Sequence, residues 1–316
     1  YKHSYSIASF LSKFESYTYN EEIGLITVDY DLAAKFNSGQ SNFLSDSMIS
    51  QLSKWMIKDD QLSRFRCNTW GVKLKGKEAV DVSGVTNQTI TMAVNSFLSQ
   101  QAHLCILSPN FIESTPEELN KPRNEDENIK SDDILVIPYP SKVDESTQNI
   151  SYAFGQVLGA ILRKGTVQDI PFPLFIWYYL SGKSISYKDV YENDHRLAEE
   201  ISQMKNGSII THQWVYREWN NTIKQLDVFP NIQYVTKEMV DVHERIVIGR
   251  RIKALVDVLN HIKKGLYKNY NVNTYIFDFT WVLLLRYAAT ESRKMNLEGI
   301  IQRVIFKNGE NLMKLK

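Results

Sequence analysis

The sequence predicts an α+β fold that is mainly helical, and two observations carry this prediction. Apolar residues recur every four positions from Ala153 to Leu162, and a second apolar stripe extends over residues 237–264, as in long amphipathic helices. Residues 25–30 and 70–84 instead show β-forming or alternating patterns, which are typical of short strands. At 316 residues, the chain is long enough to bury one large core or two moderate ones.

The helix expected to begin near Ser151 contains two glycines, Gly155 and Gly159, four positions apart. A glycine inside a helix costs about 1 kcal/mol relative to alanine. We expect a neighbouring element to pack against the bare backbone at these positions, because such close approach compensates for the cost. This helix should therefore be central in the fold.

Several short helices with clear end signals follow. Lys164-Gly165 indicates a helix stop, and an aromatic-rich helix is expected over Leu174–Leu180. Ser186 is the predicted N-cap of the next helix, which carries Asp189 in its first turn. A further helix over residues 197–204 is expected to end at Gly207.

Residues 113–133 are rich in charged side chains and are expected to form a solvated loop. Weaker sequence patterns indicate the remaining helices and strands. In chain order, these elements are a short helix at 7–14, a strand at 25–30, a helix at 43–57, a strand from 70 that turns at Gly76, a helix from 85, a helix-to-strand passage at 105–110, an apolar segment at 134–140, a strand at 230–236, and a helix at 237–264 that ends in the turn Lys264-Gly265-Leu266-Tyr267.

Composition argues against several classes of partner. Lys and Arg number 37 against 36 Asp and Glu, so bulk charge favours neither nucleic acid nor an acidic membrane surface. No secretory signal is recognisable, and no apolar run approaches the roughly 20 residues needed to span a bilayer. We expect a cytoplasmic, possibly nuclear, protein. Because the chain begins at Tyr1 and not at Met, we expect it to be part of a longer protein.

A series of motifs occurs in a fixed order, and this order and spacing resemble the amino-terminal lobe of HECT-type ubiquitin ligases. The motifs are WGVKLKGKEAVDVSG at 70–84, CILSPN at 105–110, FGQVLG at 154–159, LSGKSISYKDV at 180–190 and PNIQYVT at 230–236. The continuation VTNQTITMAV is most similar to the giant HERC-type ligases. The chain departs from the family pattern at Ser83, where glycine is usual, and at Trp281 and Val282, where acidic residues are usual.

The resemblance implies a division of the chain. It comprises an N-terminal extension (1–24), a large helical subdomain (25–194 and 237–306), a small subdomain that docks a ubiquitin-conjugating enzyme (195–236), and a hinge (307–316) toward a carboxy-terminal lobe absent from this sequence.

The implied activity is ubiquitin transfer. In this family, ubiquitin passes from a conjugating enzyme's thioester to a cysteine in the carboxy-terminal lobe, and then to a substrate lysine. Because this chain lacks the motif around that cysteine, we expect no catalytic residue here, and neither a metal nor another cofactor. The expected partners are a ubiquitin-conjugating enzyme, ubiquitin, and protein substrates held through other domains, with no nucleic acid or membrane.

The small subdomain provides the candidate binding residues. Ile210, Trp214, Tyr216 and Trp219 lie close together in the sequence, and tryptophan and tyrosine are favoured anchors of protein interfaces. The resemblance implies that they line the docking groove for the conjugating enzyme. The alternative is that the small subdomain uses these aromatic side chains for its own core.

The cysteines and histidines give no catalytic or metal pattern. Cys105 lies within the apolar run LCIL and is expected to be a buried thiol, whereas Cys67 follows Arg64 and Arg66 but lacks a reactive-cysteine motif. The six histidines share no metal-ligand spacing, and His195 beside Asp194 is read as a solvated pair at a helix start.

A second hypothesis comes from another functional class. The weakened motifs at Ser83 and Arg286-Tyr287 and the shortened small subdomain are also consistent with a degenerate HECT-like scaffold that has no transfer activity.

Overall fold

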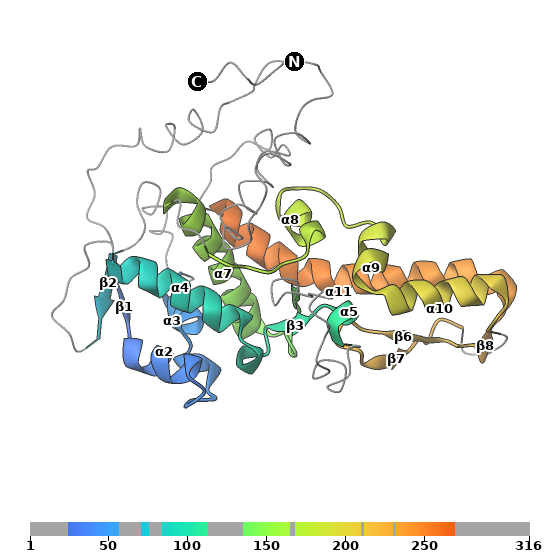
Figure 1. Cartoon of the computed structure of the whole chain (residues 1–316), viewed down its shortest axis with the longest axis horizontal. Coiled ribbons are helices and arrows are strands. Elements are labelled where there is room, and N and C mark those ends of the chain that lie inside the picture. Colours follow the sequence, from blue (N-terminus) through green and yellow to red (C-terminus); the bar gives the residue numbers. More distant parts are fainter. Residues whose placement is uncertain are drawn as a thin grey trace, which may run out of the picture.

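Two long helices, α7 (Glu145–Lys164) and α11 (Val240–Lys268), cross at the centre of the fold (Figure 1). The computed structural model describes residues 25–56, 71–75, 84–112, 135–164, 168–209, 212–229 and 232–268. Within these ranges the chain is a mainly helical α+β protein with short strands, as the sequence predicts. No helix in the described ranges is both long and apolar enough to cross a membrane.

The crossing of α7 and α11 brings backbone against backbone at two glycines. A Cβ atom added to Gly155 would lie 1.9 Å from the carbonyl oxygen of Ile262, and one added to Gly265 would lie 1.9 Å from the carbonyl oxygen of Tyr152. Each helix therefore has a glycine at the point where the backbone of the other helix comes closest. The predicted close approach at Gly155 is confirmed.

Three further helices lie on the same side of the fold as α7. They are α2 (Tyr30–Asn37), α3 (Met48–Met56) and α4 (Gly84–Leu98); α3 and α4 contact α7 directly, and α2 contacts α4. Phe97 of α4 stacks on Phe154 of α7 with ring centroids 3.8 Å apart. We call these helices, with β1 (Leu25–Val28), η1 (Leu44–Asp46), α7, α8 (Leu174–Leu180) and the C-terminal half of α11, the platform.

The described strands pair as four two-stranded sheets. Strand β1 (Leu25–Val28) is parallel to β2 (Gly71–Leu74), whereas the other pairs are antiparallel. The other pairs are β3 (Cys105–Leu107) with β4 (Val136–Pro138), β5 (His212–Gln213) with β8 (Tyr234–Val235), and β6 (Val215–Arg217) with β7 (Ile223–Gln225). Short one-turn elements complete the description: η1 (Leu44–Asp46), η3 (Gln100–Ala102), α5 (Pro109–Ile112) and η5 (Lys237–Met239).

The short helices predicted from their end signals are confirmed. Helix α8 spans Leu174–Leu180, α9 spans Tyr187–Asn193, and α10 spans His195–Asn206. Ser186 and Asp189 form a reciprocal capping box at the start of α9. Gly207 ends α10 in the left-handed conformation, with φ of 78°.

The start of α7 and the end of α11 differ from the predicted boundaries. Helix α7 begins at Glu145 and not near Ser151, because Asp144 and Thr147 exchange backbone and side-chain hydrogen bonds that cap an earlier turn. Gly265 does not end α11, which continues to Lys268, because this glycine lies inside the helix where it faces α7.

Several expectations lie outside the described residues. They are the extension 1–24 with its helix at 7–14, the turn at Gly76, the loop 113–133, residues 269–306 of the large subdomain, and the hinge 307–316.

Replacing Gly155 with alanine should lower the free energy of unfolding by about 3 kcal/mol or more, because the added Cβ would clash with helix backbone and not with an adaptable side chain. Gly249→Ala is the matched control on α11. Its Cβ would meet nothing within 4 Å, so we expect stabilisation of up to about 1 kcal/mol. Urea unfolding followed by circular dichroism measures both changes, and equal effects of the two variants would contradict the proposed packing.

Candidate functional site

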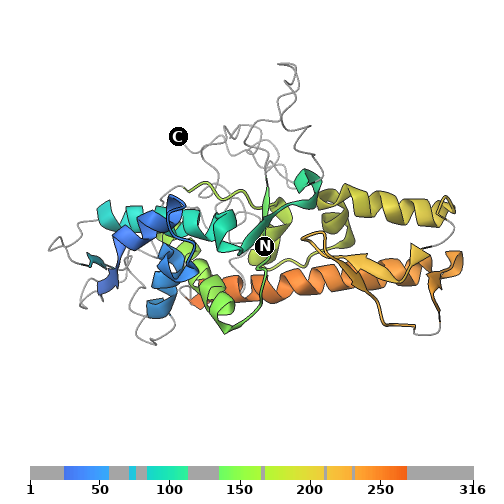
Figure 2. The same cartoon turned by 90° about the horizontal axis from the view of Figure 1, so that it is seen from below.

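Two β-ribbons lie beside helix α10 and the N-terminal half of α11, away from the crossing with α7 (Figures 1 and 2). We call residues 212–229 and 232–236, which carry the pairs β5–β8 and β6–β7, the ribbon module. Three of the predicted docking residues, Trp214, Tyr216 and Trp219, belong to it, and Ile210 lies outside the described residues. The ribbon module is therefore where the docking prediction must be examined.

The indole of Trp214 is buried, with 2% of the residue exposed. Its ring packs on Phe229 with centroids 4.8 Å apart and on His243 of α11 with centroids 5.6 Å apart. Trp214 therefore joins the ribbon module to α11 and cannot touch a partner in this conformation.

Trp219 is also buried, with 0% exposed, and it faces the platform. Its ring stacks on Phe175 of α8 with centroids 6.3 Å apart, and its Nε1 donates to the carbonyl of Arg251 at 3.0 Å. The two tryptophans thus belong to the core, which is the alternative that the sequence left open. Tyr216 is half-buried, and its ring lies under the guanidinium of Arg250 at 5.4 Å.

A buried ion pair lies where the ribbon module meets α11 and the start of α10. The guanidinium of Arg251 contacts the carboxylate of Asp194, and both side chains are almost completely buried, so the expectation that Asp194 and His195 form a solvated pair is wrong for Asp194. Burial lowers the pKa of Arg251, whereas the neighbouring Asp194 acts to raise it. Because the ordinary pKa of arginine is above 12, the side chain stays charged and the contact is ionic.

A small pocket of about 40 Å³ lies between α10 and the ribbon module. Its apolar walls include Leu197, Ile201, Val215, Tyr216, Ile223 and Val247. This volume is enough for a water molecule but not for a drug-sized ligand.

Two histidines border the same pocket. His243 is buried, and its Nε2 lies 3.0 Å from the carbonyl oxygen of Val215. Because a carbonyl can only accept, Nε2 carries the proton and Nδ1 has no hydrogen-bond partner among the described residues. The ring of His212 packs edge-on against His243 at 5.1 Å, and its Nδ1 lies 3.5 Å from Glu200.

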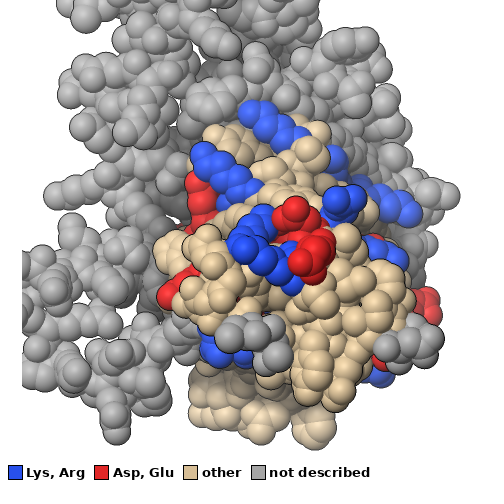
Figure 3. Space-filling view, turned by 90° about the vertical axis from the view of Figure 1, so that its right-hand side faces the viewer, with Lys and Arg blue, Asp and Glu red and all other residues tan. Residues whose placement is uncertain are grey.

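The ribbon module also presents apolar side chains to solvent. Ile223 is 58% exposed and Tyr234 is 42% exposed, and Val228 and the neighbouring Val242 of α11 are exposed as well. Figure 3 shows the end of the molecule, where acidic and basic side chains gather at the centre and a broad uncharged surface lies below them. This combination suits a protein partner better than a small charged ligand.

Comparison with protein families decides the identity. The model of the HECT-domain (ubiquitin-transferase) family matches residues 91–307, which is more than half of the chain. The chain belongs to the HECT family. The match begins within α4 and includes α7, the ribbon module and α11. A search of curated proteins finds no match.

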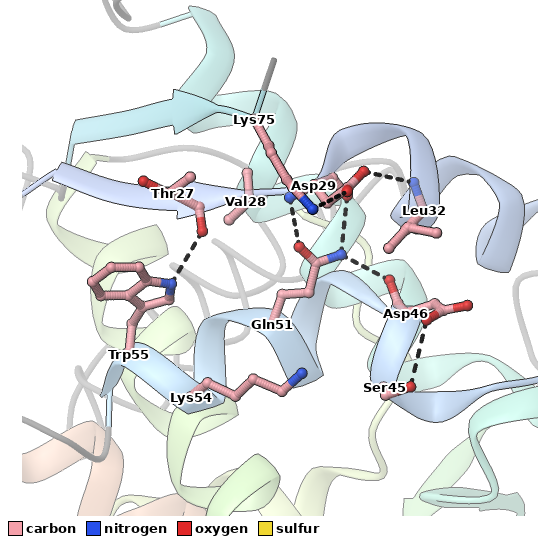
Figure 4. A pocket seen from close by; sticks show the side chains of 10 residues that line it. All are labelled: Thr27, Val28, Asp29, Leu32, Ser45, Asp46, Gln51, Lys54, Trp55 and Lys75. Carbon is pink, nitrogen blue, oxygen red and sulfur yellow. Dashed lines mark hydrogen bonds and ion pairs between the residues drawn. The ribbon is translucent and has the colours of Figure 1, made fainter. Parts of the chain in front are cut away.

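A larger pocket of this HECT-family chain, of about 290 Å³, lies on the platform between β1 and α3 (Figure 4). Gln51 receives the backbone N–H of Asp29 at 2.7 Å and donates to its carbonyl at 3.0 Å, and Trp55 donates to the carbonyl of Thr27 at 3.0 Å. Gln51 and Trp55 therefore satisfy backbone hydrogen-bonding groups along the edge of β1 that pairs with no described strand, and in the residue that follows β1.

The structure describes one of the two cysteines of this HECT-family chain. Cys105 is buried, so the expectation of a buried core thiol is confirmed, and burial raises the pKa of this thiol. Cys67 lies outside the described residues. Among those described, no group of His, Cys, Asp or Glu could hold a metal ion.

The stability of the fold should fall as the pH is lowered through the ordinary histidine pKa of about 6.5. Burial lowers the pKa of both His243 and His261 in the folded chain. As the pH falls, these histidines therefore bind protons in the unfolded chain before they do so in the folded chain. The stabilisation from neutral His243 is therefore present above this pH and is lost below it.

Urea unfolding at several pH values tests this expectation. His243→Gln retains an amide donor for the carbonyl of Val215 but does not titrate, so its stability should decline less between pH 7 and pH 5. His261→Gln separates the second contribution. An unchanged pH dependence in His243→Gln would contradict the assignment.

Proposed function

We propose that this chain forms the amino-terminal lobe of a HECT-type ubiquitin ligase and that its ribbon module docks a ubiquitin-conjugating enzyme. The observation that carries the proposal is the exposed apolar rim of Ile223, Val228 and Tyr234, in a chain of the HECT family. Interface anchors of this kind bind a partner by removing apolar surface from water.

The docking residues in this proposal differ from the set expected from sequence. Tyr216 remains from that set because it is half-buried and borders the small pocket. Ile223 and Tyr234 take the place of the two tryptophans, which lie beneath the surface and hold the ribbons on α11 and α8. Ile210 stays a prediction.

The chemistry proposed for the whole ligase is a thioester exchange. A thiolate of the ligase attacks the thioester carbonyl of the charged conjugating enzyme, ubiquitin moves to the ligase cysteine, and the enzyme's thiolate leaves. The part of this chain is to bind and orient, because holding two reactants in geometry lowers the barrier without supplying a reacting group. The resemblance to HERC-type ligases within the family stays a prediction.

Substituting Ile223 with aspartate should weaken binding of a cognate conjugating enzyme about tenfold or more, because a charge replaces an apolar contact at the proposed interface. Tyr234→Ala should act in the same direction. Biolayer interferometry against a panel of conjugating enzymes provides the measurement.

Phe43→Asp is the matched control for these variants. Phe43 is 73% exposed, but it precedes η1 on the platform, so its replacement should leave affinity unchanged. Equal effects at Ile223 and Phe43 would exclude the ribbon module as the docking surface.

Transfer activity distinguishes the ligase from the scaffold. The full-length protein should form a ubiquitin adduct with a charged conjugating enzyme that runs as a shifted band on a non-reducing gel and disappears on reduction. Binding without such an adduct would support the degenerate scaffold.

A further inference from the structure

One arginine joins three parts of the chain at the edge of the ribbon module. Arg251, in the middle of α11, donates through Nε to the carbonyl of Arg217 at 2.6 Å and through Nη2 to the carbonyl of Glu218 at 3.2 Å. Its Nη1 donates to the carboxylate of Asp194. The ring of Trp219 lies 5.1 Å from the guanidinium carbon.

The three acceptors belong to two structural parts. Arg217 and Glu218 lie at the end of β6, so they fix the ribbon module. Asp194 lies between α9 and α10, and its carboxylate also accepts from the backbone N–H of Leu197 at 2.9 Å as the cap of α10. Arg251 therefore fixes the ribbon module and the start of α10 to the same point on α11.

The geometry requires arginine in particular. A guanidinium presents five donors in a rigid plane, so one side chain can serve three acceptors in different directions. A lysine would keep the charge opposite Asp194 but could not reproduce this fork.

Stability alone does not account for the cluster. Replacing a buried ion pair with well-packed apolar residues is often neutral or stabilising. A buried ionic cluster does add a strict orientation, because each acceptor must meet its donor within a narrow range of distance and angle.

We infer that Arg251 is a positioning residue that sets the orientation of the ribbon module relative to the platform, and so the direction in which a docked conjugating enzyme presents its thioester. The effect on a docked conjugating enzyme rests on the proposed function. The orientation of the ribbon module concerns only the fold and can be tested without any partner.

The first experiment measures orientation in this chain. Spin labels on Lys54→Cys of α3 and Lys224→Cys of β7, both exposed positions, report the distance between platform and ribbon module by electron paramagnetic resonance. A Cys67→Ser background leaves the buried Cys105 as the other thiol. Arg251→Lys should broaden or shift the distance distribution, whereas Arg245→Lys, at an exposed position on α11, should not change it.

A second variant guards against simple unfolding. Asp194→Asn combined with Arg251→Met leaves no unpaired buried charge, and the asparagine can still cap α10. It should unfold cooperatively with retained helix content and also show the broadened distribution. Unchanged distributions in both variants would overturn the inference.

The second experiment measures function in the full-length protein. In Arg251→Lys, the affinity for the conjugating enzyme should stay within about twofold, while ubiquitin transfer at saturating conjugating enzyme should fall about tenfold, because misplacement affects the reacting geometry and not the docking contacts. Broadened distances with undiminished transfer would overturn the positioning role. If the parent protein binds no conjugating enzyme, the proposed function fails, and the spin-label distances still decide whether Arg251 orients the ribbon module.

Discussion

The backbone contact between α7 and α11 is the constraint on which the rest of the fold depends. Gly155 and Gly265 let each helix reach the other's carbonyl oxygens, which fixes both the separation and the rotation of the two helices. From Gly265 to Val240 the helix α11 extends about 37 Å at 1.5 Å per residue. A tilt of about 10° at the crossing would therefore move the far end by about 6 Å, so the crossing governs where the ribbon module lies.

The junction at Arg251 complements this crossing. The glycine contact is made of backbone and shape, whereas Arg251 contributes charge and directed hydrogen bonds midway along the same helix. Trp219 lies between Arg251 and Phe175 of α8, so an apolar and a polar contact meet at one place. Together these contacts make α11 the rigid connection between platform and ribbon module.

Local signals predicted much of the fold but not the orientation of the aromatic side chains. The box of Ser186 and Asp189 and the glycine at position 207 act within a few residues, so the sequence reveals them directly. The stop predicted at Gly265 is wrong, because a glycine near a helix end is as typical of a close helix crossing as of a helix stop. Trp214 and Trp219 face inward because they pack on His243 and Phe175, which approach from distant parts of the chain.

Burial of the two tryptophans also bears on the strength of the proposed docking. Interface energy usually concentrates in a few large aromatic or arginine anchors, and here the largest aromatic rings are used inside the ribbon module. The remaining anchors are smaller, and interfaces at the low end of the size range, below about 1,200 Å², are typically transient. A weak contact suits the proposed reaction, because the conjugating enzyme must leave after discharge before a charged one can bind. Orientation at Arg251, more than affinity at the rim, would then set the efficiency of transfer.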